Sequence, residues 1–281
     1  MRLDYSPPTL GAPLAPEMAG LVRIGSLEVR LATNSAEIEA AQELRHQVFF
    51  NELGATGSLA TQGHDVGRDV DRFDPFCDHL IVCDDSLPGP AHRRIVGTYR
   101  LLRQERAASC GFYSADEYEI DALAARNPTK HFLELGRSCV LPAYRSKRTI
   151  EALWEAIWAY VNAHKIDVMG GCASFPGVAP DDHAQALSFL AQNCTASDNW
   201  AIRAKADRYH QMNLLAPEAV DAKLAIKQMP PLVKGYLKLG ASFGDGCVID
   251  PEFDTVDVFV VLPVEAIAQR YINYYSPTLA S

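Results

Sequence analysis

The chain has 281 residues, of which 48% are hydrophobic and 22% are charged, and its formal net charge is -9. This composition is typical of a soluble globular protein with a packed core, and it excludes disordered, collagen-like and disulfide-dependent classes. The acidic balance also disfavours nucleic acid as a partner, because a phosphate backbone selects basic surfaces.

The seven cysteines are irregularly spaced and include no C-x-x-C pair, which disfavours a disulfide framework, a zinc site or an iron–sulfur cluster. We therefore expect free thiols, no bound metal and a cytoplasmic location. No apolar run reaches the length of about 20 residues that a membrane span needs, and the N-terminus lacks the pattern of a signal peptide. Residues 1–20 contain four prolines and predict a poorly ordered arm, which leaves 21–281 as a single domain.

The first part of the chain alternates between strand and helix signals. A strand over 27–32 leads into a helix that begins after Asn34, because asparagine is a preferred N-cap and an acid follows three residues later. After a loop rich in glycine and aspartate, two β-branched runs joined by turn residues predict a hairpin over 79–83 and 94–103.

The rest of the chain continues this alternation. The apolar residues from Ile150 to Val161 recur at steps of three and four, which predicts a long amphipathic helix with a buried face. The full set of expected elements is a short helix around 115–125, a strand over 131–141, this long helix, a strand over 166–174, a helix over 181–192, a helical insert near 195–230, strands near 235–240 and 255–262, and a tail helix from about 263. This order predicts a mixed α/β sheet flanked by helices.

Several familiar catalytic signatures are absent from the sequence. There is no P-loop, no G-x-G-x-x-G after a strand, no G-x-S-x-G and no H-E-x-x-H. Cys139 lacks an obvious histidine partner and is better interpreted as a buried thiol than as a nucleophile. Covalent catalysis is therefore disfavoured.

Glu134 is the first candidate for catalysis. It lies in the middle of an apolar strand, where a carboxylate is costly unless it is paired or used, and strict alternation places it on the face opposite Arg137. We therefore consider Glu134 a candidate general base. The alternative is that it only forms an ion pair with Arg100 or Arg45.

Charge is unevenly distributed along the chain. Residues 51–90 contain eight acids and two bases, and 241–265 contain six acids and no base. In contrast, 130–150 contain five bases and one acid. This pattern predicts one basic patch for an anionic ligand and an acidic region for a cationic one, although each cluster could also be a solvated face.

Short motifs in a fixed order resemble those of a known family. The patterns R-x-x-V-F-x-x-E, D-x-x-D, G-x-x-R-L and E-x-x-R resemble those of acyl-homoserine-lactone synthases and long-chain N-acyl amino acid synthases of the GNAT superfamily, and the run over 234–264 is similar to bacterial ornithine-lipid N-acyltransferases. The matching positions are Arg45, Val48, Phe49, Glu52, Asp71, Asp74, Gly97, Arg100, Glu134 and Arg137.

The resemblance implies a fold and an activity. The fold would be a mixed, mostly antiparallel GNAT-like sheet, and the activity the transfer of a (3-hydroxy)acyl chain from acyl carrier protein to the α-amine of ornithine, which gives lyso-ornithine lipid. No cofactor is implied beyond the phosphopantetheine of the donor. The lipid product makes peripheral contact with the inner membrane plausible.

The resemblance also implies roles for individual residues. Glu134 would be the base, with Glu52 as the alternative, and Arg137 or the strand edge would stabilise the oxyanion. The remaining matches would bind the amino acid: Asp71 and Asp74 its cationic side chain, and Arg45 or Arg100 its carboxylate. Asp74 could instead cap the turn before the proline that follows it.

The sequence departs from the superfamily at two points. The turn over 144–149 lacks the glycines that bring backbone close to the pyrophosphate of coenzyme A. Its Arg145, Lys147 and Arg148 suit the acidic surface of acyl carrier protein instead. In addition, Gly136 stands where the family has serine, which removes a hydroxyl group that could contact substrate.

Two other functions compete with this interpretation. One is an N-acyl synthase for a different amino acid or an acyl-homoserine-lactone synthase, although the C-terminal similarity argues against it. The other is a non-catalytic module that binds acyl carrier protein without turnover, which substitution of the two candidate bases would distinguish.

Overall fold

The computed structural model describes residues 21–56, 67–197 and 199–267. These residues form one eight-stranded sheet with the strand order β1-β2-β3-β4-β5-β6-β8-β7. The strands are β1 (Val22–Ile24), β2 (Leu27–Leu31), β3 (Asp78–Asp84), β4 (Ile95–Arg103), β5 (Phe132–Val140), β6 (Val168–Pro176), β7 (Ser242–Asp250) and β8 (Thr255–Pro263). Only β5 and β6 pair in parallel, so the mixed, mostly antiparallel sheet confirms the predicted fold class. The predicted arm over 1–20 lies outside the described residues.

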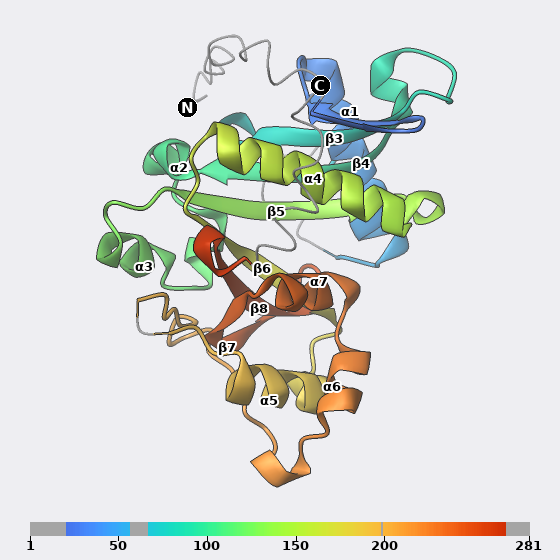
Figure 1. Ribbon diagram of the computed structural model, residues 1–281. Coiled ribbons are helices and arrows are strands. Elements are labelled where there is room, and N and C mark those ends of the chain that lie inside the picture. Colours follow the sequence, from blue (N-terminus) through green and yellow to red (C-terminus); the bar gives the residue numbers. More distant parts are fainter. Residues whose placement is uncertain (1–20, 57–66, 198, 268–281) are drawn as a thin grey trace, which may run out of the picture.

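Helices cover both faces of the sheet (Figure 1). They are α1 (Ser35–His46), continued by a π-helix (Gln47–Glu52), α2 (Gln104–Cys110), α3 (Ile120–Arg126), α4 (Lys147–Ala163), α5 (Ala184–Asn193), α6 (Ala222–Gln228) and α7 (Pro231–Leu239). As predicted, α1 begins where the Asn34 side chain accepts a hydrogen bond from the Glu37 backbone N–H. None of the helices in the described ranges has the length and apolar character to cross a bilayer.

The two faces have separate hydrophobic cores. On one face, α4, α5 and α7 pack on alternate residues of the strands, and the predicted stripe of α4 is buried at Leu153 and Ile157. On the other face, α1 packs on β3 through Ala41 and Ile81, while α2 and α3 contribute to a further cluster. The second face, between α1 and α3, carries the polar residues described below.

The sheet divides between β5 and β6. These strands pair only from Phe132–Val168 to Glu134–Gly170, although β5 continues to Val140 and β6 to Pro176. Figure 1 shows β6 and β8 slanting away from the direction of β5. Within the described chain, the edge of β5 after Glu134 has no strand partner on the β6 side.

The predicted alternation of side chains along β5 is wrong at Arg137, because the strand contains a β-bulge. The register with β4 shifts between Thr98 and Arg100, where Arg137 has a left-handed φ of 51°. The extra residue reverses the alternation, so Arg137 lies on the same face as Glu134 rather than on the opposite one. Sequence spacing could not reveal this, because a bulge leaves no periodic signal.

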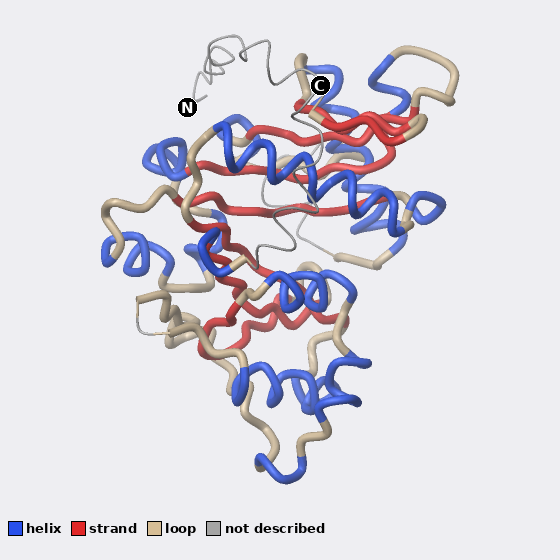
Figure 2. The backbone as a smooth tube through the Cα atoms, viewed as in Figure 1, coloured by secondary structure: helices blue, strands red, loops and turns tan. Residues whose placement is uncertain are grey.

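The C-terminal half contains the other differences from the prediction. The predicted strand near 235–240 is wrong: this segment is the end of α7, and β7 follows it. The predicted helical insert near 195–230 is helical mainly at α6, whereas most of the chain between α5 and α6 is loop (Figure 2). Beyond β8, only a short 3-10 turn over 264–266 is described, and the remainder of the predicted tail helix lies outside the described residues.

Candidate active site

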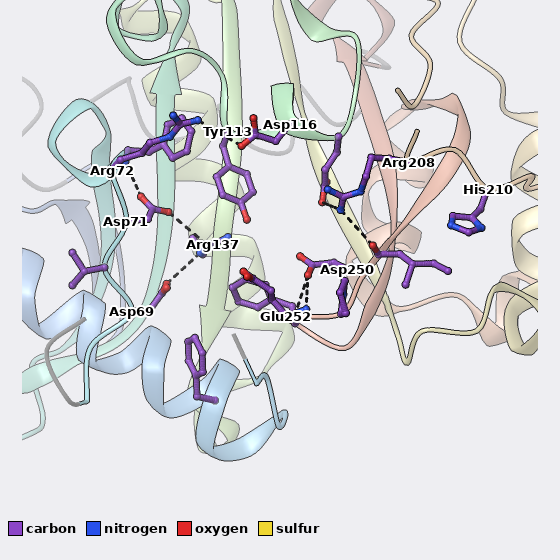
Figure 3. A pocket seen from close by; sticks show the side chains of 17 residues that line it. Asp69, Asp71, Arg72, Tyr113, Asp116, Arg137, Arg208, His210, Asp250 and Glu252 are labelled. Carbon is purple, nitrogen blue, oxygen red and sulfur yellow. Dashed lines mark hydrogen bonds and ion pairs between the residues drawn. The ribbon is translucent and has the colours of Figure 1, made fainter. Parts of the chain in front are cut away.

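A cavity of about 710 Å³ opens on the face of the sheet that carries Arg137. Side chains from the loop before β3, the turn before α3, β5, the 208–210 loop and the β7–β8 turn converge on it (Figure 3). Acids outnumber bases in its lining, which includes the carboxylates of Asp69, Asp71, Asp116, Glu117, Asp250 and Glu252 and the guanidinium groups of Arg72, Arg137 and Arg208. The cavity therefore favours a ligand with net positive charge.

Three arginines and three aspartates form a buried network beside this cavity, which we call the Arg–Asp network (Arg45, Asp69, Asp71, Asp74, Arg100 and Arg137). The fully buried Arg45 donates from Nε to Asp69 Oδ2 over 2.8 Å and from Nη2 to Asp74 Oδ2 over 2.9 Å. Arg100 Nη1 donates to Asp71 Oδ2 over 2.6 Å. Formal charges cancel within the network.

The arginines lower the pKa values of Asp71 and Asp74. Burial acts to raise the pKa of Asp74, but Arg45 and Arg100 outweigh it, so this pKa lies well below its usual range. The pKa of Asp71 is lowered in the same way by Arg100 and Arg137 against the effect of burial. The network is consequently a set of charged hydrogen bonds with little capacity to exchange protons near neutral pH.

Arg137 links the network to the cavity. Its guanidinium lies 4.6 Å from the ring centroids of both Tyr113 and Phe253, and its Nε is 3.2 Å from Asp69 Oδ2. Figure 3 shows Asp69 and Asp71 directed at it from one side. Held between two rings and two carboxylates, this guanidinium has little conformational freedom.

Glu134 does not line this cavity. Its carboxylate is buried and accepts hydrogen bonds from the backbone N–H groups of Tyr113 and Ser114, at 2.7 and 2.8 Å, and from the Ser114 hydroxyl at 2.5 Å. Burial raises its pKa, and these hydrogen bonds offset part of that effect. Glu134 thus anchors the turn that carries Tyr113, and it does not form the ion pair with Arg100 or Arg45 that the sequence suggested as an alternative.

Glu52 and the basic patch lie elsewhere. Glu52 accepts two hydrogen bonds from Arg145, at 2.5 and 2.7 Å, and its pKa is lowered by that guanidinium. Arg145, Lys147 and Arg148 are exposed at the start of α4. Cations are disfavoured at a helix N-terminus, so a cluster of them there suits an anionic partner.

The structure thus brings together only part of the predicted site. Asp71 and Arg137 line the cavity, whereas Arg45, Asp74 and Arg100 form its buried support. Asp74 also accepts a hydrogen bond from the Asp71 backbone N–H over 3.1 Å, so it stabilises the turn as the sequence alternative suggested.

Sequence reasoning missed several residues of the site. Asp69 was identifiable from the acidic run that contains Asp71, but Glu117 follows no motif and gains its place only through the tertiary fold. Its carboxylate lines the cavity and lies 3.2 Å from the Cys172 thiol. Asp257 lies beside them, within a group whose ligand atoms are all within 4.8 Å of one another.

Part of the chain matches a protein-family model, and solved structures show a weaker similarity. Residues 44–155 match the family model for the acetyltransferase (GNAT) domain. Among solved structures, an N-acyl amino acid synthase, FeeM, from uncultured soil microbes covers 88% of this chain and 97% of its own, with 10% identity and a TM-score of 0.48.

Curated relatives are much more similar in sequence. L-ornithine N(alpha)-acyltransferases from Brucella abortus and Agrobacterium fabrum are 57% and 55% identical to this chain over 91% and 90% of its length, and 90% and 86% of their own. The enzyme of that name from Rhizobium meliloti is 52% identical over 93% of this chain and 88% of its own. The chain therefore belongs to the L-ornithine N(alpha)-acyltransferase family and is an acyltransferase of the GNAT type.

Proposed function

We propose that this enzyme transfers a 3-hydroxyacyl chain from acyl carrier protein to the α-amine of ornithine, which gives lyso-ornithine lipid. The observation that carries the proposal is the cavity with six carboxylates and three arginines. Ornithine at neutral pH has two ammonium groups and one carboxylate, so its net charge complements this lining. The names of the relatives support the same acceptor.

The acyl donor would approach through the division of the sheet. Beyond Glu134, the edge of β5 has no partner on the β6 side in the described chain, so its backbone groups can pair with an extended amide-containing arm. Phosphopantetheine is such an arm. The thioester would then lie near the bulge at Arg137, where the guanidinium or a strand N–H could stabilise the oxyanion.

The basic patch supports a protein donor. Acyl carrier protein is acidic, and Arg145, Lys147 and Arg148 present positive charge at the start of α4, beside the end of β5. The Arg145 guanidinium also donates to the Val140 carbonyl over 2.9 Å, which connects the patch to the free edge of the strand. This continuity favours a carrier protein over free coenzyme A.

The geometry also revises the residue roles. Because Arg45, Asp74 and Arg100 are buried in the Arg–Asp network, we assign them to positioning rather than to contact with ornithine. Glu134 is likewise a positioning residue, since its carboxylate is already occupied by the turn over 113–114. Glu52 is held by Arg145 and does not line the cavity, so we do not assign the base to either carboxylate suggested by the sequence.

The experiment is a reconstituted transfer assay. Purified enzyme is incubated with 3-hydroxyacyl carrier protein and ornithine, and free thiol and product mass are measured. Ornithine-dependent thiol release with the mass of N-acyl-ornithine is the expected result. Release with lysine or another amine but not with ornithine would reassign the acceptor, and the absence of release with every amine would favour a non-catalytic carrier-binding module.

A further inference from the structure

A second group of buried ionisable side chains lies where the sheet divides. We call it the carboxylate cluster (Glu117, Cys172 and Asp257). Cys172 is on β6, two residues beyond the last pair with β5, and Asp257 is on the neighbouring strand β8. Glu117 follows the turn that Glu134 anchors, so three separate elements meet at this point.

Unlike the Arg–Asp network, this cluster has little positive charge to balance it. Asp257 is 7% exposed, and its Oδ1 has no hydrogen-bond partner in the described part of the chain. Arg208 contacts the cluster, with its Nη2 3.7 Å from Glu117 Oε1, and its side chain is 37% exposed. The charge of Arg137 also acts on Asp257, but it does not outweigh burial. Asp250 adds further negative charge nearby.

The imbalance makes the carboxylates good proton acceptors near neutral pH. Burial, followed by the charge of Asp257, raises the pKa of Glu117 to about 7, while Cys172 and Arg208 oppose the shift only in part. Burial also raises the pKa of Asp257 to about 6. Two carboxylates this close share one proton over part of the pH range, so the pair titrates as a unit.

Arg208 and Glu117 together present a positive and a negative group side by side on the cavity wall. An α-amino acid has the complementary arrangement, because its carboxylate and its ammonium are attached to the same carbon. With the carboxylate on Arg208, the ammonium is directed at Glu117. Glu117 contacts Cys172, which lies just beyond the last pair of β5 and β6, so an α-amine at Glu117 would lie beside the division of the sheet. The side-chain ammonium would then be left for the other carboxylates of the cavity.

We propose that Glu117, backed by Asp257, is the general base that removes a proton from the α-ammonium of the amino acid, and that Arg208 binds the carboxylate of the same molecule. This assignment rests on the proposed function and adds to it the residues that activate the acceptor. It also gives Glu134 a purpose, because Glu134 holds Ser114, whose carbonyl accepts a hydrogen bond from the Glu117 backbone N–H over 3.0 Å.

The reaction step balances as follows. The α-ammonium gives one proton to the Glu117 carboxylate and becomes a neutral amine. The nitrogen then forms a bond to the thioester carbon as the carbon–sulfur bond breaks, and a second proton passes from nitrogen to the departing sulfur. The products are an amide and a thiol, and the proton held by the cluster is released to solvent.

The test compares Glu117→Gln with Glu119→Gln in the transfer assay. Glu119 is exposed, lies two residues away and does not line the cavity, so it receives the same chemical change outside the site. We expect Glu117→Gln to lower kcat/KM at pH 7 about 100-fold, the lower end of the effect of a general base. Glu119→Gln should match the unmodified enzyme.

The pH profile separates a chemical role from a structural one. The unmodified enzyme should reach a plateau above about pH 7 as the cluster loses its proton. Glu117→Gln should instead keep rising about tenfold per pH unit until the amine itself is deprotonated, since free amine is then the only reactive form. A loss by the same factor at every pH would overturn the assignment, because it would indicate a structural defect.

Three further measurements test the roles of Glu117, Arg208 and the cluster separately. In ¹³C-carboxyl NMR of the unmodified enzyme, the signal missing from Glu117→Gln should titrate above pH 6, and titration near pH 4.5 would contradict the proposal. Arg208→Gln should raise the KM for ornithine with a smaller effect on kcat. Loss of activity on chelation with recovery on adding zinc would also overturn it, because the cluster would then bind metal.

The outcomes also separate this inference from the proposed function. If the unmodified enzyme releases no thiol with ornithine, the proposed function fails. If it does release thiol and Glu117→Gln retains full activity, the function stands and the base assignment fails.

Discussion

The Arg–Asp network and the carboxylate cluster lie on the same face of one sheet, yet they treat charge in opposite ways. In the network, each buried aspartate contacts at least one buried arginine, and the pKa values of Asp71 and Asp74 are lowered. In the cluster, Glu117 contacts one partly exposed arginine, no ion pair to Asp257 is found in the described part of the chain, and the pKa values of both carboxylates are raised. Balanced charges stabilise a fixed geometry, whereas unbalanced charges create a group that exchanges protons near pH 7.

The first experiment tests whether the Arg–Asp network depends on charge balance, by removing one of its arginines. Arg45→Ala would leave Asp69 and Asp74 as buried carboxylates without their main partner. Removing one member of a buried ion pair costs about 3 to 5 kcal/mol, and we expect a loss of that size in the free energy of unfolding. Urea denaturation at pH 7 measures it.

Arg93→Ala is the matched control, because Arg93 is exposed in the turn before β4. It should change the free energy of unfolding by less than about 0.5 kcal/mol. If Arg45→Ala costs no more than the control, the network does not support the cavity by charge balance.

The second experiment removes the charge of the cluster and should have the opposite sign. The pKa of Glu117 is higher in the folded chain than in the unfolded one, so its contribution to stability is greatest below about pH 4.5 and falls as pH rises to about 7. Glu117→Gln removes this loss. We therefore expect the variant to be more stable than the unmodified enzyme by about 3 kcal/mol at pH 8.

At pH 4 the two proteins should unfold at the same urea concentration, since Glu117 is then protonated in both states of the unmodified enzyme. If the variant and the unmodified enzyme are equally stable at pH 8, the ionised Glu117 carboxylate is as stable in the folded chain as in water. The comparison between network and cluster would then be wrong.

The third experiment tests the residue that connects the two regions. Glu134→Gln replaces an acceptor of three hydrogen bonds by a group with only one acceptor oxygen. Loss of a hydrogen bond to a charged group costs about 1.5 to 3 kcal/mol, so we expect destabilisation of about 2 kcal/mol and roughly tenfold lower kcat. Because Glu134 acts through the turn, the shape of the pH profile should stay that of the unmodified enzyme.

If the pH profile of Glu134→Gln instead loses its plateau, as we expect for Glu117→Gln, then Glu134 is the general base. Ser114→Ala provides a control within the same contact. It removes one of the three donors to Glu134 and should produce a smaller loss of the same kind.

The sequence predicts the secondary structure better than it predicts the candidate site. The capping signal at Asn34, the hairpin of β3 and β4 and the stripe of α4 are local patterns. The first two are confirmed, and the stripe is buried from Leu153 onward, whereas Ile150 in the first turn is exposed. The helix over 231–239 was missed although two local signals mark it: Pro231 at its first position and Gly240 in left-handed conformation after its end. Gly244 and Gly246 weaken the strand signal of β7, so the boundary between α7 and β7 has no clear mark in the sequence.

The site was less accessible to sequence reasoning. Motif similarity identified the network residues, but it could not distinguish buried support from cavity lining, because both leave the same pattern of charged residues. The position of Arg137 depends on a bulge, and that of Glu117 on the approach of β8 to the turn before α3. Burial and long-range proximity, which determine the pKa of a carboxylate, are not encoded in local spacing.

The smallest expected effect concerns the basic patch, which lies apart from both regions. Lys147 is highly exposed and its Nζ lies 3.3 Å from Glu151 Oε1 one turn along α4. Reversing its charge replaces this surface pair by a like-charge pair, which should cost no more than about 0.5 kcal/mol and leave the cavity unchanged. Lys147→Glu should raise the KM for 3-hydroxyacyl carrier protein several-fold at low salt with kcat unaffected, because rim charges act on association. The difference should disappear near 0.5 M salt, where such charges are screened. Lys223→Glu, an equal change on the distant helix α6, should have no effect on this KM; if both variants behave alike, the enzyme responds to net charge rather than to a docking surface at α4.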